Sequence, residues 1–177
     1  QELLLARDRL GIKPLVYASL PNGGLAFASE IQALMGHRGI DTSHDPKAIS
    51  EYLACLYIPA PRTGRLGIRK VPPGHFLRWR AGRFTLERYW SPHFSGERTP
   101  SLHEALEELE PLLRRAIQEH MVSDVPIGCF LSGGIDSSVI AALMAEESRR
   151  QNGRPIRTFT MAFDEAAYDE SDAARVV

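Results

Sequence analysis

The second half of the chain takes its fold from one stretch, Leu131-Ser132-Gly133-Gly134-Ile135-Asp136-Ser137-Ser138. A short apolar run without alternation, 127–131, leads into this stretch and predicts a buried parallel strand. The apolar period of about 3.6 that follows predicts a helix over 136–147. A polar loop over 148–154 and a second apolar strand over 156–163 complete the pattern. With the helix expected before it, this order indicates an α/β unit with a parallel sheet.

The glycine-rich turn lies where the carboxyl end of a strand meets the amino end of a helix. Open α/β sheets bind their ligands at this place. Gly133 and Gly134 have no Cβ, so their main chain can approach a ligand and direct N–H groups at it. The next helix adds free N–H donors and partial positive charge, and Ser132, Ser137 and Ser138 add hydroxyl donors. The sequence therefore predicts a phosphate site here.

Asp136 would repel a phosphate unless a cation lay between them. Its position therefore suggests Mg²⁺, which accepts carboxylate and phosphate oxygens together. The alternative is a Ser/Gly-rich turn in which Asp136 only favours the first turn of the helix. The stretch is not a Walker A loop, because no Gly-Lys-Ser/Thr follows the glycines.

The first half of the chain is rich in turn signals and alternates with a period of two. Strands are expected over 2–7, 14–19, 25–28, 74–78 and 83–87, with hairpin turns at 21–24 and 81–82. A short helix is expected over 30–35 with Ser29 as its N-cap, and a second helix opens at Asp45-Pro46. The apolar face of that second helix is expected to contain Ile49, Tyr52, Leu53 and Leu56.

A polar segment over 91–100, with two prolines and a glycine, is the expected domain boundary. After it, Ser101-Leu102-His103-Glu104 predicts a capping box at the start of a helix that reaches about residue 121. Pro111 lies inside this helix, so a kink or a division into two parts is expected there.

Composition excludes several classes of protein. The chain has 177 residues, 21 Lys+Arg and 22 Asp+Glu, so its formal net charge of -1 gives no bulk attraction for nucleic acid or an anionic membrane. No apolar run approaches the ~18 residues that span a bilayer. Cys55 and Cys129 are expected to be buried thiols in a reducing, cytoplasmic compartment. Because the chain starts at Gln1 and ends within a helical pattern at 171–177, it is expected to be a fragment.

The stretch 132–138 resembles the PP-loop of the ATP pyrophosphatases, which split ATP between its α and β phosphates. Five further runs extend the likeness over nearly the whole chain: 6–15 (ARDRLGIKPL), 27–31 (FASEI), 59–63 (PAPRT), 71–75 (VPPGH) and 123–131 (SDVPIGCFL). Together they resemble the glutamine-hydrolysing asparagine synthetases.

The resemblance implies a fold, a domain order and a reaction. Residues 1–94 would be the α+β tail of an N-terminal-nucleophile glutaminase, a type 2 glutamine amidotransferase. Residues 95–177 would begin an α/β parallel-sheet PP-loop ATP pyrophosphatase domain. In the family, ammonia from glutamine displaces AMP from an aspartyl-adenylate that is made with ATP and Mg²⁺. ATP, aspartate and glutamine are then the expected small-molecule partners, and a homodimer is compatible with the likeness.

The resemblance also assigns residues. The nucleotide would be bound by Phe130, Leu131, Ser132, Gly133, Gly134, Asp136, Ser137, Ser138 and Met161, with Asp136 also on the metal. Phe130 and Met161 would meet the adenine through their main chain. No catalytic residue is expected within the chain, because the family's nucleophile is an N-terminal cysteine that neither Cys55 nor Cys129 can replace. The isolated chain is thus expected to show no turnover and at best weak ATP binding.

Three smaller expectations and two alternatives remain open. Arg7 and Asp8 are expected to form a structural ion pair, His75 to order a turn, and 169–171 to cap a helix rather than bind metal. The alternative functions are a related amidotransferase acting on another carboxylate, β-lactam-synthetase-like or in cell-envelope assembly, and a non-catalytic nucleotide-binding remnant.

Overall fold

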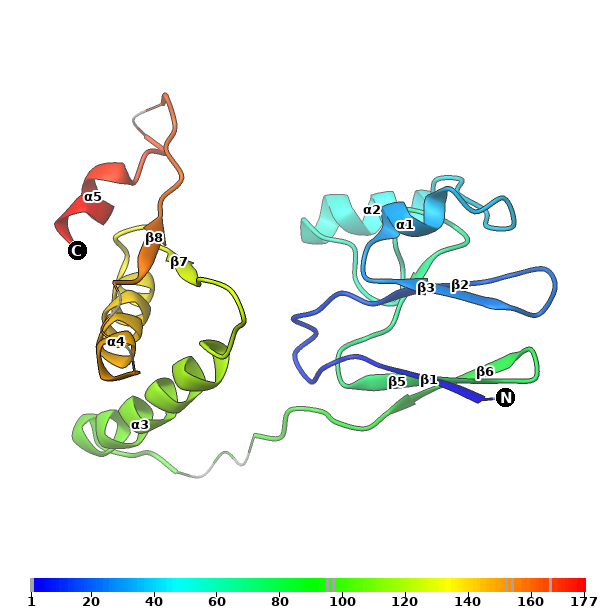
Figure 1. Cartoon of the computed structure of the whole chain (residues 1–177). Coiled ribbons are helices and arrows are strands. Elements are labelled where there is room, and N and C mark those ends of the chain that lie inside the picture. Colours follow the sequence, from blue (N-terminus) through cyan, green and yellow to red (C-terminus); the bar gives the residue numbers. More distant parts are fainter. Residues whose placement is uncertain (1, 95, 97, 152, 154, 166) are drawn as a thin grey trace. The chain divides into compact units, whose positions relative to one another are not determined.

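The computed structural model describes residues 2–94, 96, 98–151, 153, 155–165 and 167–177. The chain divides into two compact units, 1–95 and 96–177, called unit 1 and unit 2. Each unit is described by itself, and Figure 1 labels the elements of both.

Unit 1 contains two small antiparallel sheets and two helices. One sheet has the order β1 (Glu2–Ala6), β5 (His75–Arg80), β6 (Arg83–Arg88), and the other has the order β3 (Leu25–Ala28), β2 (Val16–Ser19), β4 (Arg69–Lys70). The helices are α1 (Ile31–Met35) and α2 (Pro46–Cys55). Figure 1 shows three layers, with the helices over the β3-β2-β4 sheet and the β1-β5-β6 sheet on its other side.

Strand β2 joins the two cores of unit 1 because its side chains alternate between the faces of its sheet. Val16 and Ala18 belong to the cluster on the helix side, together with Leu34 of α1. Tyr17 points the other way and packs with Leu77 of β5 in the cluster between the sheets. Because β2 is buried on both faces, its first three residues are all apolar or aromatic instead of alternating with polar ones.

The strands and hairpins of unit 1 confirm the sequence expectations to within about two residues at each end. The predicted cap of α1 is wrong: Glu30 occupies the N-cap, and it makes no side-chain capping bond. The cap of α2 is confirmed, because the Asp45 carboxylate accepts a 3.0 Å bond from the Lys47 N–H.

The apolar face predicted for α2 does not lie in the core. Ile49, Tyr52, Leu53 and Leu56 are all about half exposed or more. The helix instead buries Ala48, whose exposure is 0%. The buried residue of this helix is thus a small one, and its larger apolar side chains remain exposed.

Arg7 and Asp8 do not pair with each other, so the predicted ion pair is wrong, although both residues are structural. The Arg7 guanidinium donates to the carbonyl oxygens of Gly11 and Val71, each at 2.8 Å. The Asp8 carboxylate accepts from the N–H groups of Ile12 and Lys13. These two bonds lower the pKa of Asp8, and together the two side chains hold the 7–13 loop against β4 and its neighbouring segment.

His75 contacts the Pro73 carbonyl oxygen through Nδ1 at 2.8 Å, which confirms its expected part in the turn. Cys55 and Cys129 are free thiols, as expected, but Cys55 is exposed and Cys129 only partly buried. Cys55 is the last residue of α2 and faces away from the core. Burial raises the pKa of the Cys129 thiol.

Unit 2 follows the predicted order of helix, strand, helix and strand. Its elements are α3 (Leu102–His120), β7 (Gly128–Phe130), α4 (Ile135–Gln151), β8 (Arg157–Phe159) and α5 (Ser171–Val176). Strands β7 and β8 are parallel, which confirms the expected kind of sheet. The capping box at Ser101 and Glu104 is also confirmed.

Two features of the helices in unit 2 differ from the expectation. Helix α3 runs unbroken through Pro111 instead of dividing into two. Helix α4 continues to Gln151, whose side chain donates to Glu147 at 2.9 Å and supports the last turn. The predicted loop at 148–154 therefore starts later, and its residues 152 and 154 lie outside the described part of the chain.

Strand β8 has three residues instead of the predicted eight, and among the described residues it pairs only with β7, which is equally short. The sheet is also less buried than predicted. Phe130 is 79% exposed, whereas Leu131 at the end of the run is 7% exposed and packs with Ala141 and Ala174.

The segment before α5 behaves as a cap. The Asp169 carboxylate accepts from the Ser171 N–H at 3.1 Å and from its hydroxyl at 2.6 Å, and these bonds lower the pKa of Asp169. Glu170 occupies the N-cap without a side-chain bond. Across the described residues, no helix is long and apolar enough to cross a membrane.

Candidate functional site

The Ser-Gly loop, residues 131–134, connects β7 to α4 and is fixed at its strand end. The Leu131 N–H donates to the Phe159 carbonyl oxygen at 2.9 Å, and the Leu131 carbonyl accepts from the Thr160 hydroxyl at 2.8 Å. With the Leu131 side chain in the core of unit 2, the start of the loop is held on three sides. Sequence reasoning did not identify Thr160, which lay inside the predicted strand 156–163 and follows directly after the observed end of β8.

The serine hydroxyls bind one another and the loop main chain. Ser132 Oγ and Ser137 Oγ lie 3.0 Å apart, and Ser137 Oγ accepts from the Ser132 N–H at 3.2 Å. Ser138 donates its hydroxyl proton to the Gly134 carbonyl oxygen at 2.7 Å. A hydroxyl has a single proton, so Ser138 would have to exchange this bond to donate to a ligand. The loop is thus closed on itself at the start of α4.

Gly133 and Gly134 are glycines for different structural reasons. Gly133 has φ +78, and a Cβ there would lie 2.5 Å from the carbonyl carbon of Ala173 on α5. A Cβ on Gly134 would meet only Ser132 Oγ, at 3.4 Å. Gly133 is therefore required by α5, and Gly134 is the glycine that leaves the loop open to a ligand. This contact with α5 was not predicted. The sequence signal for it was the pair of small residues Ala173 and Ala174.

Asp136 is exposed in the first turn of α4, where its negative charge interacts favourably with the positive end of the helix dipole. The described residues contain no group of three or more His, Cys, Asp and Glu side chains placed to hold a metal. Asp136 would accordingly give a cation one protein oxygen, with phosphate and water completing the shell. Mg²⁺ accepts such a set, whereas structural zinc sites need several protein ligands.

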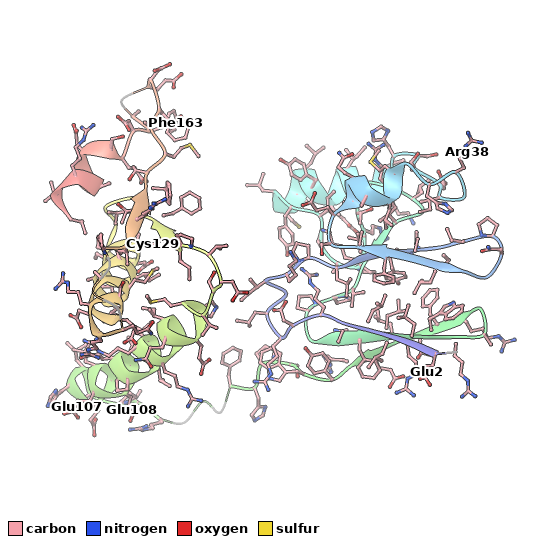
Figure 2. The ribbon with its side chains drawn as sticks, in the orientation of Figure 1. Glu2, Arg38, Glu107, Glu108, Cys129 and Phe163 are labelled. Atoms are coloured by element: carbon pink, nitrogen blue, oxygen red, sulfur yellow. The ribbon has the colours of Figure 1, made fainter. Side chains whose placement is uncertain are left out.

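Phe130 and Met161 lie at the same edge of the sheet as the loop. The register pairs Phe130 with Phe159, and Met161 follows two residues later, beyond the end of β8. Both side chains are exposed, at 79% and 65%. In Figure 2, Cys129 marks β7 and Phe163 marks the segment beyond β8. The structure thus brings all the predicted nucleotide-binding residues to the carboxyl ends of two parallel strands.

A cavity of about 330 Å³ lies at the other end of β7, lined by residues that include Ser123, Met144 and Arg157. It is separate from the Ser-Gly loop, because it opens at the amino ends of the strands.

Comparison with known proteins agrees with both units. Residues 1–90 match the glutamine amidotransferase domain family, and residues 108–177 match the asparagine synthase family. A Mycobacterium tuberculosis protein, whose name assigns it to the glutamine-hydrolysing asparagine synthetases, is 38% identical over 98% of this chain and 27% of its own length. Asparagine synthetase 3 of Bacillus subtilis is 34% identical over 92% of this chain and 26% of its own length.

A relative with a different name matches over the same span. The amidase chyE of Penicillium rubens is 32% identical over 99% of this chain and 27% of its own length. The chain spans about a quarter of the length of each of these curated relatives. The chain therefore belongs to the glutamine-hydrolysing asparagine synthetase family, with a glutamine amidotransferase domain match at 1–90 and the start of an asparagine synthase domain at 108–177.

Proposed function

We propose that residues 130–138 and Met161 bind ATP, and that the whole protein uses this ATP to convert aspartate to asparagine with ammonia from glutamine. The observation that carries the proposal is the joining of β7 to α4 by a Ser-Gly loop with an open Gly134 and an exposed Asp136. Membership of the asparagine synthetase family supports the choice of reaction.

The loop would act on the pyrophosphate portion of ATP. The first N–H groups of α4 have no acceptor within the helix, and the helix dipole adds partial positive charge at the same point. Ser132, Ser137 and Ser138 would donate hydroxyl bonds once they release the loop, and Asp136 would hold Mg²⁺. The bound ion would neutralise phosphate charge, so that pyrophosphate can leave.

The adenine would lie against the strand ends. The main-chain groups of Phe130 and Met161 would hydrogen-bond to its edge, which leaves their exposed side chains free to vary. The aspartate carboxylate would then attack the α-phosphorus and release pyrophosphate. Ammonia would next attack the acyl carbon and release AMP, completing the amide.

Unit 1 belongs to the glutamine amidotransferase domain family, so we propose that its parent domain supplies the ammonia. We expect the 177 residues alone to show neither glutamate release nor asparagine formation, because the family's terminal cysteine nucleophile is not among them.

The test is product analysis on a polypeptide of the relatives' full length that carries this sequence, with aspartate, glutamine and ATP. We expect asparagine, AMP, pyrophosphate and glutamate. Asp136→Asn should lower AMP formation at least about tenfold, whereas Asp124→Asn, an equally exposed change outside the loop, should leave it unchanged. Formation of neither AMP nor asparagine by the unchanged protein would contradict the proposal.

A second candidate function is amidation of another carboxylate by the same loop, and the match to an amidase favours keeping it. In that case AMP would form with a different acceptor acid while aspartate gave none. A non-catalytic remnant would bind MgATP and form no AMP with any acceptor.

A further inference from the structure

A second site candidate lies in unit 1, in a cavity of about 440 Å³ beside the first turn of α2. Four of the side chains that line it are cationic, namely Lys47, Arg62, Arg65 and Arg69, and Asp45 is its one acidic lining residue. They come from the start of α2, from the loop 62–65 and from β4. Cationic side chains from three segments of the chain thus line this one cavity.

The loop that carries two of the arginines is held rigidly by a buried threonine. Thr63 is 1% exposed, and its hydroxyl donates to the Ile68 carbonyl oxygen at 2.8 Å while accepting from the Arg65 N–H at 3.1 Å. Arg65 is further fixed by a 3.0 Å bond from Nη1 to the Thr42 carbonyl oxygen. Arg65 and the loop that carries it are therefore positioned before any ligand arrives.

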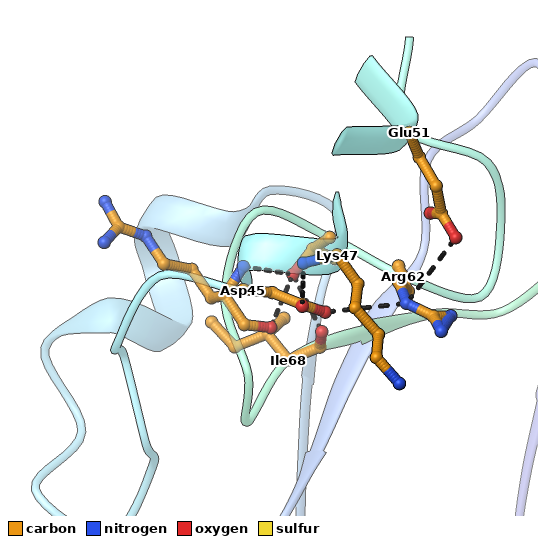
Figure 3. A network of polar contacts seen from close by, with 7 residues as sticks. Asp45, Lys47, Glu51, Arg62 and Ile68 are labelled. Atoms are coloured by element: carbon orange, nitrogen blue, oxygen red, sulfur yellow. Dashed lines mark hydrogen bonds and ion pairs between the residues drawn. The ribbon is translucent and has the colours of Figure 1, made fainter. Parts of the chain in front are cut away.

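Carboxylates neutralise only part of this charge. Arg62 Nε lies 3.7 Å from a carboxylate oxygen of Asp45 and 3.7 Å from one of Glu51, and Figure 3 shows both contacts on the Nε side of the guanidinium. The other Glu51 oxygen is buried without a hydrogen-bond partner. Within the part of the chain that the structure describes, the side chains of Lys47 and Arg69 form no ion pair. Four cations against two carboxylates leave an excess of two positive charges.

We propose that this cavity binds a phosphate-class oxyanion of the size of inorganic phosphate or pyrophosphate. The guanidinium fork matches the oxygens of phosphate in pairs, and Lys47 adds a point charge. A phosphate group carries about -1.5 to -2 charges at neutral pH, which balances the excess. The site is in unit 1 and is independent of the ATP proposal for the loop in unit 2.

The test is a titration of the ¹⁵N-labelled 177-residue chain with inorganic phosphate and with pyrophosphate at about 0.15 M salt, where screening weakens non-specific attraction. We expect saturable amide shifts that centre on Asp45, Lys47 and residues 62–69. The double variant Lys47→Gln with Arg69→Gln should weaken binding at least about tenfold, because two charged hydrogen-bond donors are lost. Both positions are exposed, so the fold should persist, which circular dichroism checks.

The matched control removes the same charges elsewhere on unit 1, as Lys13→Gln with Arg38→Gln, both exposed. We expect this pair to change the affinity less than about twofold. Equal weakening by the two pairs would overturn the proposal, since only net charge would then matter. Shifts confined to 132–138, or no saturation by about 20 mM of either anion, would overturn it as well.

Discussion

Replacing Gly133 by alanine tests the packing of the Ser-Gly loop against α5. The left-handed φ of +78 costs a residue with a Cβ about 1–2 kcal/mol. The new methyl would also lie 2.5 Å from the carbonyl carbon and 2.7 Å from the carbonyl oxygen of Ala173. Main-chain atoms cannot rotate away as a flexible side chain can, and such overpacking costs about 1–3 kcal/mol more. We expect Gly133→Ala to destabilise unit 2 by about 2–5 kcal/mol.

Two other glycines separate the contributions. Gly153 has φ +67 with no atom within 4 Å of an added Cβ, so Gly153→Ala should show the cost of φ alone, about 1–2 kcal/mol. Gly134→Ala has neither the φ nor a contact closer than 3.4 Å and should change stability by less than about 1 kcal/mol. The expected order of destabilisation is therefore Gly133, then Gly153, then Gly134.

The assay is urea unfolding with two signals. Far-UV circular dichroism follows the long helices α3 and α4 of unit 2, whereas the fluorescence of Trp79 and Trp90 reports on unit 1. With a urea dependence of about 1–3 kcal/mol per molar, Gly133→Ala should lower the midpoint of the dichroism transition by about 1–3 M. Hydrogen exchange of the peptide 171–177 should also accelerate. A midpoint for Gly133→Ala equal to that of Gly153→Ala would refute the proposed contact with α5.

Three further changes have defined outcomes. Thr63→Val keeps the shape but removes the hydroxyl bond to the Ile68 carbonyl, and it should cost about 1–3 kcal/mol in urea unfolding followed by tryptophan fluorescence. Ser101→Ala removes the cap of α3 and should cost about 1 kcal/mol in unfolding followed by circular dichroism. The Arg114 hydrogen bond lowers the pKa of Glu146 below its ordinary 4.5, so this contact stabilises the folded chain fully above that value and is lost as the pH falls through the lower folded pKa. Acid titration should therefore show a loss of stability below about pH 4.5 that Glu146→Gln reduces by the contribution of this contact.

Local rules predicted much of the fold because turns and caps depend on a few neighbouring residues. The Asp45 cap and the Ser101 capping box need only the residues within one helical turn. The hairpin turn at 81–82 likewise depends on two adjacent residues, Ala81 with φ +48 and Gly82 with φ +80. These elements lie where the sequence placed them.

The predictions were wrong where residues distant in the sequence determine the length of a strand or the buried face of a helix. Strand β8 stops at Phe159 because β7 offers no more partners, which no property of 156–163 reveals. The face of α2 was misassigned because its buried residue is the small Ala48, whereas the larger apolar residues are exposed. The helical periodicity of apolar residues shows that they share one face of a helix, but it does not show that this face is buried.

The candidate loop was predictable in position but not in its internal bonds. A strand, two glycines and a helix start are local signals, and the loop lies where they indicate. The closure of Ser138 onto the Gly134 carbonyl and the approach of Ala173 to Gly133 depend on side-chain rotation and on a helix about 40 residues away. Neither the hydrogen bond nor the close approach can be predicted from the local sequence pattern.

The central claim is that the 132–138 stretch binds the phosphates of ATP with Mg²⁺. The most direct measurement is a ¹⁵N amide titration of the chain with MgATP and, separately, with ATP in the presence of a chelator. We predict weak saturable binding, with a dissociation constant on the order of 1 mM, that shifts the amides of 132–138 and loses its Mg²⁺ dependence in Asp136→Asn. No shifts in 132–138 by about 10 mM MgATP, or identical titrations with and without Mg²⁺, would contradict the claim.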